Sequence, residues 1–174
     1  SRRQRQMCIR DRYEIHERDM DTLEDMVVKS CTYKKLVVEK DPTEKGERAI
    51  LNFGHTIGHA IEKAKNFELL HGECVALGCV AAAFISWKRE LLSMEEYYEI
   101  RDMFVPFNLP ITIDDIDPNE ILRLIASDKK VEGDKIKFIL LKKVGKAIID
   151  TSVTKDEIMS GIQEIYFSEE DEHE

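Results

Sequence analysis

The sequence predicts a mainly α-helical protein with one small β-hairpin. Apolar residues recur at helical spacing through most of the 174 residues, whereas the alternation typical of a strand is confined to residues 136–149. The alternating strand–helix order of a dinucleotide-binding fold is missing, and so is a G-x-G-x-x-G motif. By itself, therefore, the chain is not expected to bind a dinucleotide in the usual way.

Composition indicates a globular protein, with 43% hydrophobic and 35% charged residues. The longest apolar stretch, residues 74–87, is shorter than the roughly 20 residues that span a bilayer, so we expect a buried helix and no membrane partner. The four cysteines form no C-x-x-C pair, and residues 1–20 lack the apolar core of a secretory signal. We therefore expect reduced, structural thiols and a cytoplasmic protein.

Both ends differ in composition from the rest of the chain. Residues 1–12 carry five arginines against one aspartate, and Met-Cys-Ile-Arg-Asp-Arg is the in-frame translation of a common sequencing-library adapter. We interpret 1–12 as a non-native leader and expect no nucleic-acid partner. Residues 168–174 are almost entirely acidic and are expected to be a disordered tail. The functional domain is then residues 13–167.

Helical spacing predicts a helix over residues 13–38 with one apolar face and one solvated face. Pro42 and Gly46 mark a turn, and a second helix is expected over 47–65. The segment 66–70 breaks the pattern.

The apolar residues after the break predict a buried helix over 72–91. Ser93 is a predicted N-cap for a helix that ends before Pro106, and Asp117 for a helix with Pro118 at its first position. The hairpin follows around Gly145. The last helix is expected over residues 154–165.

Three of the five histidines lie in residues 46–73, GERAILNFGHTIGHAIEKAKNFELLHGE. His55 and His59 are four residues apart, so a helix would place both imidazoles on one face, about 6 Å apart. This spacing suits two ligands of one Zn²⁺ ion, or one ligand and a neighbouring acid–base group. His71 begins another predicted helix and could turn back to the same point.

The residues around these histidines favour a site over a coincidence. An H-x-x-x-H pair alone is more often incidental than metal-binding, but Gly54, Gly58, Arg48 and Asn52 accompany this one. A glycine inside a helix costs roughly 1 kcal/mol relative to alanine, so the two glycines indicate the close approach of a backbone, a cofactor or a substrate. Three acidic residues are candidate ligands by residue type only: Glu62, Glu68 and Glu73.

Two runs resemble the signature of the 3-dehydroquinate synthase family: R-A-I-L-N-F-G-H-T-I-G-H-A-I-E and, after a short gap, H-G-E-C-V-A-L-G. Upstream, K-K-L-V-V-E-K-D-P-T-E-K-G (34–46) is similar to the family's lysine-then-acid segment. Downstream, S-D-K-K-V-E-G-D-K-I-K-F-I-L-L-K-K-V-G (127–145) resembles its D-K-K…G…L-L…G segment. The resemblance covers about residues 13–165.

The resemblance implies the C-terminal helical domain of the dehydroquinate synthase-like fold. The family's N-terminal half, which binds NAD⁺, would precede this chain. So would the family's third zinc ligand, a glutamate in an E-x-x-K segment. Residues 24–29, E-D-M-V-V-K, do not match that segment, so we carry over no glutamate ligand.

The resemblance also implies roles for individual residues. His55 and His71 match the family's metal ligands, for Zn²⁺ or Co²⁺, whereas His59 matches a histidine at the substrate phosphate. Arg48 and Asn52 match groups around the substrate carboxylate and hydroxyls.

Three lysines complete the implied substrate site. Lys34 matches a substrate-contacting lysine, and either Lys129 or Lys130 would reach the phosphate. Solvent exposure is the ordinary alternative for a lysine. The implied catalytic residues are His59, Lys34, Arg48 and Asn52.

The implied reaction is the NAD- and metal-dependent cyclisation of 3-deoxy-D-arabino-heptulosonate 7-phosphate to 3-dehydroquinate, with loss of phosphate, in the shikimate pathway. The full-length enzyme would be a homodimer, and this chain alone would be inactive. One alternative is another enzyme on the same fold, either a different sugar-phosphate cyclase or an iron-type polyol dehydrogenase. A second is a helical metal-binding module without activity.

Overall fold

The computed structural model describes residues 19–43, 46–127, 131–132 and 135–166. The chain divides between Leu51 and Asn52 into two compact units. The leader predicted at 1–12 and the tail predicted at 168–174 lie outside the described residues. In the described part of the chain, no helix has the length and apolarity needed to cross a membrane.

The first unit contains helix α2, Met20–Lys40, which confirms the later part of the helix predicted over 13–38. Residues 13–18 lie outside the described residues. Asp19 caps it by accepting a hydrogen bond from the Thr22 backbone N–H at 2.8 Å. The predicted apolar face is present but not buried, and Met26, Val27 and Leu36 are exposed. Helical spacing predicts which residues share a face of a helix, but not whether another element covers that face.

The continuous helix predicted over 47–65 is wrong. The 3₁₀ helix η1 spans Glu47–Asn52, and helix α3 begins only at His55 and runs to Ala64. Gly54 separates the two with φ +78°, a left-handed conformation in which the chain cannot continue an α-helix. Its carbonyl nevertheless accepts the first bond of α3, from the Gly58 N–H at 3.0 Å.

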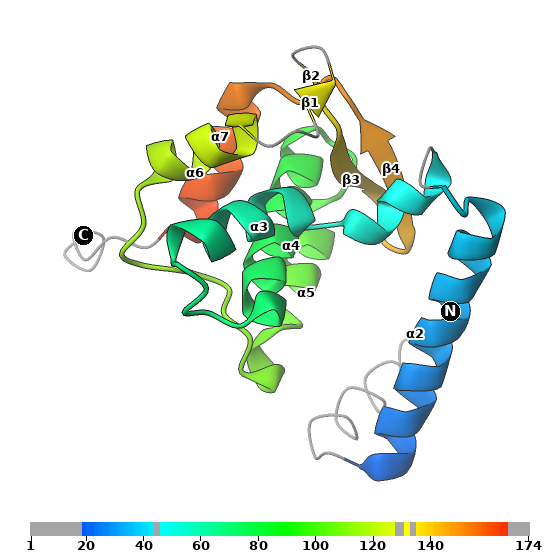
Figure 1. Ribbon diagram of the computed structural model, residues 1–174. Coiled ribbons are helices and arrows are strands. Elements are labelled where there is room, and N and C mark those ends of the chain that lie inside the picture. Colours follow the sequence, from blue (N-terminus) through cyan, green and yellow to red (C-terminus); the bar gives the residue numbers. More distant parts are fainter. Residues whose placement is uncertain (1–18, 44–45, 128–130, 133–134, 167–174) are drawn as a thin grey trace. The chain divides into compact units, whose positions relative to one another are not determined.

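In the second unit, helix α4, His71–Lys88, runs through the middle of the fold (Figure 1). It is buried along most of its length, as the apolar stretch predicted. It contacts α3, α5 (Met94–Asp102), α7 (Lys155–Ile165) and strand β3 (Phe138–Lys143). Ser86 ties α4 to β3, because its Oγ donates to the Ala82 carbonyl at 2.8 Å and accepts from the Leu141 N–H at 3.0 Å. A buried hydroxyl is thereby satisfied.

The remaining helices begin where the sequence predicts. Ser93 caps α5 and Thr154 caps α7. In each case the cap side chain accepts a hydrogen bond from the backbone N–H of a glutamate three residues later, and the carboxylate of that glutamate accepts one from the backbone N–H of the cap residue. Asp117 precedes α6, Pro118–Ser127, which packs on α3 and α7. A short 3₁₀ helix, η2, spans Val105–Phe107.

The predicted hairpin is confirmed as β3, Phe138–Lys143, paired antiparallel with β4, Lys146–Asp150. Leu140 lies opposite Ile148, and Gly145 at φ +80° makes the turn. A second antiparallel pair, β1 (Val131–Glu132) with β2 (Lys135–Ile136), was not predicted. Two-residue strands are too short to show the alternation on which such a prediction depends.

Helices α3 and α4 touch backbone to backbone at three glycines. A Cβ atom on Gly78 would lie 1.9 Å from the Gly54 carbonyl oxygen and 2.8 Å from the Gly58 nitrogen. A Cβ atom on Gly58 would lie 2.8 Å from the Cys74 carbonyl oxygen. The sequence predicted that a backbone, a cofactor or a substrate comes close to Gly54 and Gly58. The structure shows the backbone of α4 in that place.

Arg89, just after α4, joins this helix to α7 and the end of β4. Its Nε and Nη2 donate to the two carboxylate oxygens of Glu157 at 2.6 and 2.8 Å, and its Nη1 donates to Asp150 at 3.0 Å. The hydrogen bonds from Arg89, with a smaller contribution from those of Thr154, lower the pKa of Glu157 to about 2. This ion pair is bidentate and partly shielded from water.

Replacement of Gly78 with alanine is predicted to destabilise the protein by about 1–3 kcal/mol or more, because the new methyl group must push α3 and α4 apart. Gly72 is a matched control in the same helix, since a Cβ there meets nothing within 4 Å. Gly72→Ala should raise stability by up to about 1 kcal/mol. Urea unfolding followed by circular dichroism measures both. Equal stability of the two variants would contradict the close contact.

The Arg89–Glu157 pair predicts acid sensitivity. Because the pKa of Glu157 is lowered in the folded protein, its stabilisation is complete above the ordinary value of 4.5 and is lost as pH falls toward about 2. Glu157→Gln should therefore lose less stability than the unmodified chain between pH 6 and pH 3. The exposed Glu99→Gln is the control and should keep the full pH dependence. Identical urea midpoints for all three chains at both pH values would refute the assignment.

Candidate metal and substrate site

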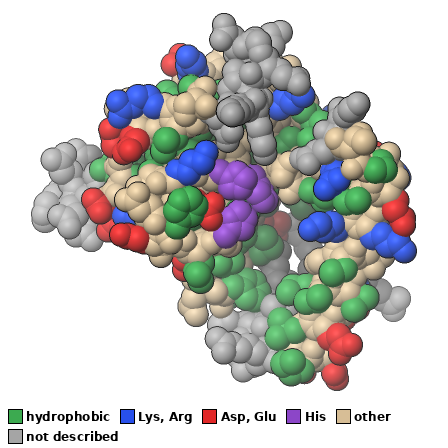
Figure 2. Space-filling model, viewed as in Figure 1, with side chains coloured by type: hydrophobic (Ala, Val, Ile, Leu, Met, Phe, Trp, Pro, Cys, Tyr) green, Lys and Arg blue, Asp and Glu red, His purple; other side chains and the backbone are tan. Residues whose placement is uncertain are grey.

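The histidines His55 and His59 of α3 and His71 of α4 converge on one point of the surface. Their ring centroids are 5.2 Å apart for His55 and His59, 5.5 Å for His55 and His71, and 5.6 Å for His59 and His71. The first two are half-buried and the third is exposed. Figure 2 shows them as a single purple patch accessible to solvent.

Local backbone structure brings the third histidine to the other two. After α3 ends, Asn66 and Phe67 take left-handed conformations, with φ of 50° and 62°, and the chain reverses. Helix α4 then begins at His71, and Glu73 fixes its start by accepting the Leu70 N–H at 2.8 Å. The glycine contact holds the two helices together, with Gly54 against Gly78 and Gly58 against Cys74 in the first turn of α4.

The imidazoles of His55 and His71 are oriented by hydrogen bonds at Nδ1. His55 Nδ1 lies 3.1 Å from the Phe53 carbonyl oxygen, and His71 Nδ1 lies 3.2 Å from Oε1 of Glu62. A carbonyl and a carboxylate can only accept, so each bond places the proton on Nδ1. Each Nε2 then keeps its lone pair, as a metal ligand requires.

The three histidines fit a transition-metal ion. One ligand nitrogen from each ring can be chosen so that all lie within 4.8 Å of one another, whereas tetrahedral ligands of Zn²⁺ lie about 3.4 Å apart. Closing this difference needs only small side-chain rotations. Neutral imidazole suits Zn²⁺ and Co²⁺, and such ions take four ligands, so other donors would complete the coordination.

The neighbouring cysteines are structural. Burial raises the pKa of the Cys79 thiol to about 12, and its Sγ donates to the Phe53 carbonyl at 3.7 Å. Burial, reinforced by Glu62 and Glu73, raises the pKa of Cys74. Both thiols therefore stay protonated at neutral pH and are poor ligands and nucleophiles. The three described cysteines are free, as the sequence predicted.

The other predicted site residues belong to several parts of the chain. Asn52 belongs to the second unit and is half-buried, three residues before His55. Lys34 and Arg48 belong to the first unit, where Lys34 is exposed on α2 and the Arg48 Nη1 donates to the Pro42 carbonyl at 2.9 Å. Lys129 and Lys130 lie outside the described residues.

Glu62 has a contact that the sequence analysis did not predict. The sequence marked it as a candidate metal ligand by residue type only, yet its carboxylate contacts the ring of His71. A usable signal was present, because Glu62 follows His59 by three residues and so shares its face of the helix.

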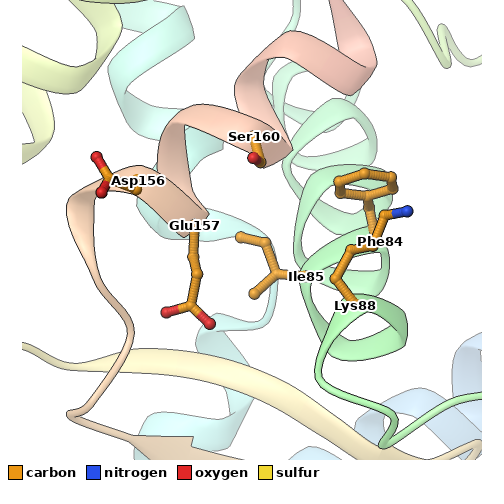
Figure 3. A pocket seen from close by; sticks show the side chains of 6 residues that line it. All are labelled: Phe84, Ile85, Lys88, Asp156, Glu157 and Ser160. Atoms are coloured by element: carbon orange, nitrogen blue, oxygen red, sulfur yellow. The ribbon is translucent and has the colours of Figure 1, made fainter.

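Two cavities lie away from the histidines. One, of about 330 Å³, lies between α4 and α7 and is lined by Phe84, Ile85, Lys88, Asp156, Glu157 and Ser160 (Figure 3). The other, of about 410 Å³, has Asp115, Asp117 and Glu120 in its lining. Neither lining includes a predicted site residue.

Comparison with known families decides the relationship. The family described as 3-dehydroquinate synthase C-terminal matches residues 4–131. The chain belongs to this family. The match begins inside the segment 1–12, whose assignment as a leader stays a prediction.

Curated members of the 3-dehydroquinate synthase family align with most of the chain. The chain is 42% identical over 137 residues to the 3-dehydroquinate synthase of Nitrosospira multiformis, a match that covers 78% of this chain and 37% of that protein. It is 37% identical over 151 residues to that of Dehalococcoides mccartyi, covering 87% and 42%. The chain thus spans well under half the length of these relatives.

Solved structures share the helical fold. A 2-epi-5-epi-valiolone synthase from Streptomyces hygroscopicus, with NAD⁺ and Zn²⁺ bound, aligns with a TM-score of 0.75 at 21% identity, over 84% of this chain and 41% of that one. A 2-deoxy-scyllo-inosose synthase complexed with carbaglucose-6-phosphate, NAD⁺ and Co²⁺ aligns with a TM-score of 0.67 at 29% identity, over 76% and 39%. The predicted fold class is therefore confirmed.

The histidine geometry predicts measurable metal binding by this member of the 3-dehydroquinate synthase family. Zn²⁺ should bind weakly to the 174-residue chain, and His55→Ala or His71→Ala should lower its affinity at least about 10-fold, since each removes a ligand. His59→Ala is the matched control, because the family resemblance assigns this residue to the substrate. Calorimetric titration gives the affinities. An equal loss in His59→Ala would instead make His59 a metal ligand.

Proposed function

We propose that this chain supplies the metal- and substrate-binding half of a 3-dehydroquinate synthase. The reaction would convert 3-deoxy-D-arabino-heptulosonate 7-phosphate to 3-dehydroquinate and inorganic phosphate. The observation that carries the proposal is the convergence of His55, His59 and His71 in a member of this family. The relatives' greater length supports a further segment that completes the enzyme.

The metal would be held by His55 and His71. Both have Nδ1 engaged in hydrogen bonds, which leaves Nε2 for coordination. A bound Zn²⁺ or Co²⁺ would act as a Lewis acid toward substrate oxygens. The two related structures, which contain NAD⁺ with Zn²⁺ and NAD⁺ with Co²⁺, support this choice of cofactors.

The substrate is a phosphorylated keto acid, so local cations must attract it to a chain whose net charge is −9. Arg48 would bind the carboxylate, because its planar guanidinium forms paired hydrogen bonds with such a group. Lys34 would contact the substrate as a point charge. Lys129 or Lys130 would do the same for the phosphate.

The remaining two residues would act on hydroxyl and phosphate groups. Asn52 would hold a substrate hydroxyl through its side-chain amide. His59, beside both proposed metal ligands, would contact the departing phosphate, where an imidazole can move a proton. NAD⁺ would supply a temporary oxidation of the substrate that makes the adjacent C–H acidic. A homodimer and a cytoplasmic location remain predictions.

A second candidate is another sugar-phosphate cyclase. The 29% identity to 2-deoxy-scyllo-inosose synthase favours this candidate. The structure of that enzyme contains carbaglucose-6-phosphate, which has no carboxylate. Arg48 and Lys34 favour a substrate with a carboxylate instead. The choice therefore depends on which sugar phosphate is turned over.

The proposal predicts activity only when this chain is joined to the N-terminal part of such an enzyme. A chimera that joins the N-terminal part of the Nitrosospira multiformis enzyme to residues 13–174 should release phosphate from the heptulosonate phosphate in the presence of NAD⁺ and Zn²⁺. The 174-residue chain alone should not. His71→Ala in the chimera should reduce the rate about 100-fold or more, since a lost ligand removes several kcal/mol of charge stabilisation.

Controls separate the alternatives. Glucose 6-phosphate and a neutral polyol are assayed beside the heptulosonate phosphate, and circular dichroism verifies that each chimera is folded. Turnover of glucose 6-phosphate alone would favour the second candidate. Turnover of the polyol alone, or NAD-dependent activity of the isolated chain, would contradict the proposal.

A further inference from the structure

Glu62 connects the two helices that form the histidine site. It lies on α3, one turn after His59, and its Oε1 is 3.2 Å from Nδ1 of His71, the first residue of α4. Only 18% of its side chain is exposed, against 54% for His71. The more buried carboxylate therefore contacts the more exposed ring.

The two other glutamates near the site do not share this arrangement. The carboxylate of Glu73 accepts a hydrogen bond from the Leu70 N–H at the start of α4. Glu68 is exposed in the connection between α3 and α4. Among the described residues, Glu62 is the carboxylate that contacts one of the three site histidines.

This contact selects one form of the ring. A carboxylate accepts a hydrogen bond and cannot donate one, so it stabilises the His71 tautomer with hydrogen on Nδ1. A neutral imidazole in water prefers the opposite tautomer, with hydrogen on Nε2, where the nitrogen cannot bind a metal. Without a partner at Nδ1, the ring would also rotate freely about its side-chain bonds.

The geometry points to Glu62 as a positioning residue that fixes the tautomer and orientation of His71 and leaves its Nε2 free for the metal. The inference rests on the proposed function for the metal role of His71. His55 has a corresponding partner in the Phe53 carbonyl, which belongs to the backbone and which substitution cannot remove. His71 depends on a side chain, so its orientation is the one that mutation can test.

The test uses the 174-residue chain with Zn²⁺ alone as the probe. Removal of the acceptor in Glu62→Ala should weaken Zn²⁺ binding about 10–100-fold, the range found for partners of metal-bound histidines. Glu62→Gln keeps an oxygen acceptor and should restore most of the affinity. Glu68→Ala removes an equal charge from the connection that follows α3 and should leave the affinity unchanged.

A second readout does not depend on metal. In the metal-free chain at pH 8, nitrogen-15 NMR of the imidazoles should find His71 with hydrogen on Nδ1. Glu62→Ala should shift it to the Nε2–H form, Glu62→Gln should retain the Nδ1–H form, and Glu68→Ala should match the unmodified chain. A merely structural role for Glu62 would change stability without changing this tautomer.

The two readouts separate the inference from the proposed function. If the unmodified chain binds no Zn²⁺, the proposed metal site fails, while the tautomer still tests Glu62. An Nε2–H or doubly protonated His71 in the unmodified chain overturns the inference. So does an unchanged tautomer in Glu62→Ala, or an equal loss of Zn²⁺ affinity in Glu62→Ala and Glu68→Ala.

Discussion

The site depends on the contact between the backbones of α3 and α4. Gly54, Gly58 and Gly78 have no side chains to separate the helices, and a single Cβ at Gly78 would come within 1.9 Å of a carbonyl oxygen. Because the two helices lie this close, the three histidines that they carry fall within reach of one ion. The glycines are therefore part of the site, although they carry no chemistry.

Much of the fold follows from local sequence. Helix starts at Ser93, Asp117 and Thr154 were predictable because a capping side chain needs only its next few neighbours. The course of the chain at Gly54 was not, because its left-handed turn is needed for contact with residues on α4 that lie more than twenty positions away. The exposure of the apolar side of α2 was also missed, since helical spacing shows which residues share a face but not what covers it.

The site was also predictable only in part, because local spacing does not show which distant residues come together. The spacing of His55 and His59 places both on one face of a helix, whereas the position of His71 depends on the reversal at Asn66 and Phe67. The sequence marked 66–70 as a break in the helical spacing, but phenylalanine rarely adopts a left-handed conformation, so the direction of the reversal was not predictable. The sequence allowed His71 to turn back to this point, and the family resemblance then paired it with His55 as a metal ligand. Glu62 was noted as a possible ligand, but its contact with the ring of His71 requires the packed helices.

X-ray absorption at the zinc edge tests the central claim most directly, because it identifies the atoms around the ion in the chain loaded with one equivalent of Zn²⁺. Convergence of the rings predicts a nitrogen shell at about 2.0 Å with the multiple-scattering pattern of at least two imidazoles. A shell of oxygen atoms alone, or of sulfur at about 2.3 Å, would contradict the claim that α3 and α4 join these histidines into one metal site.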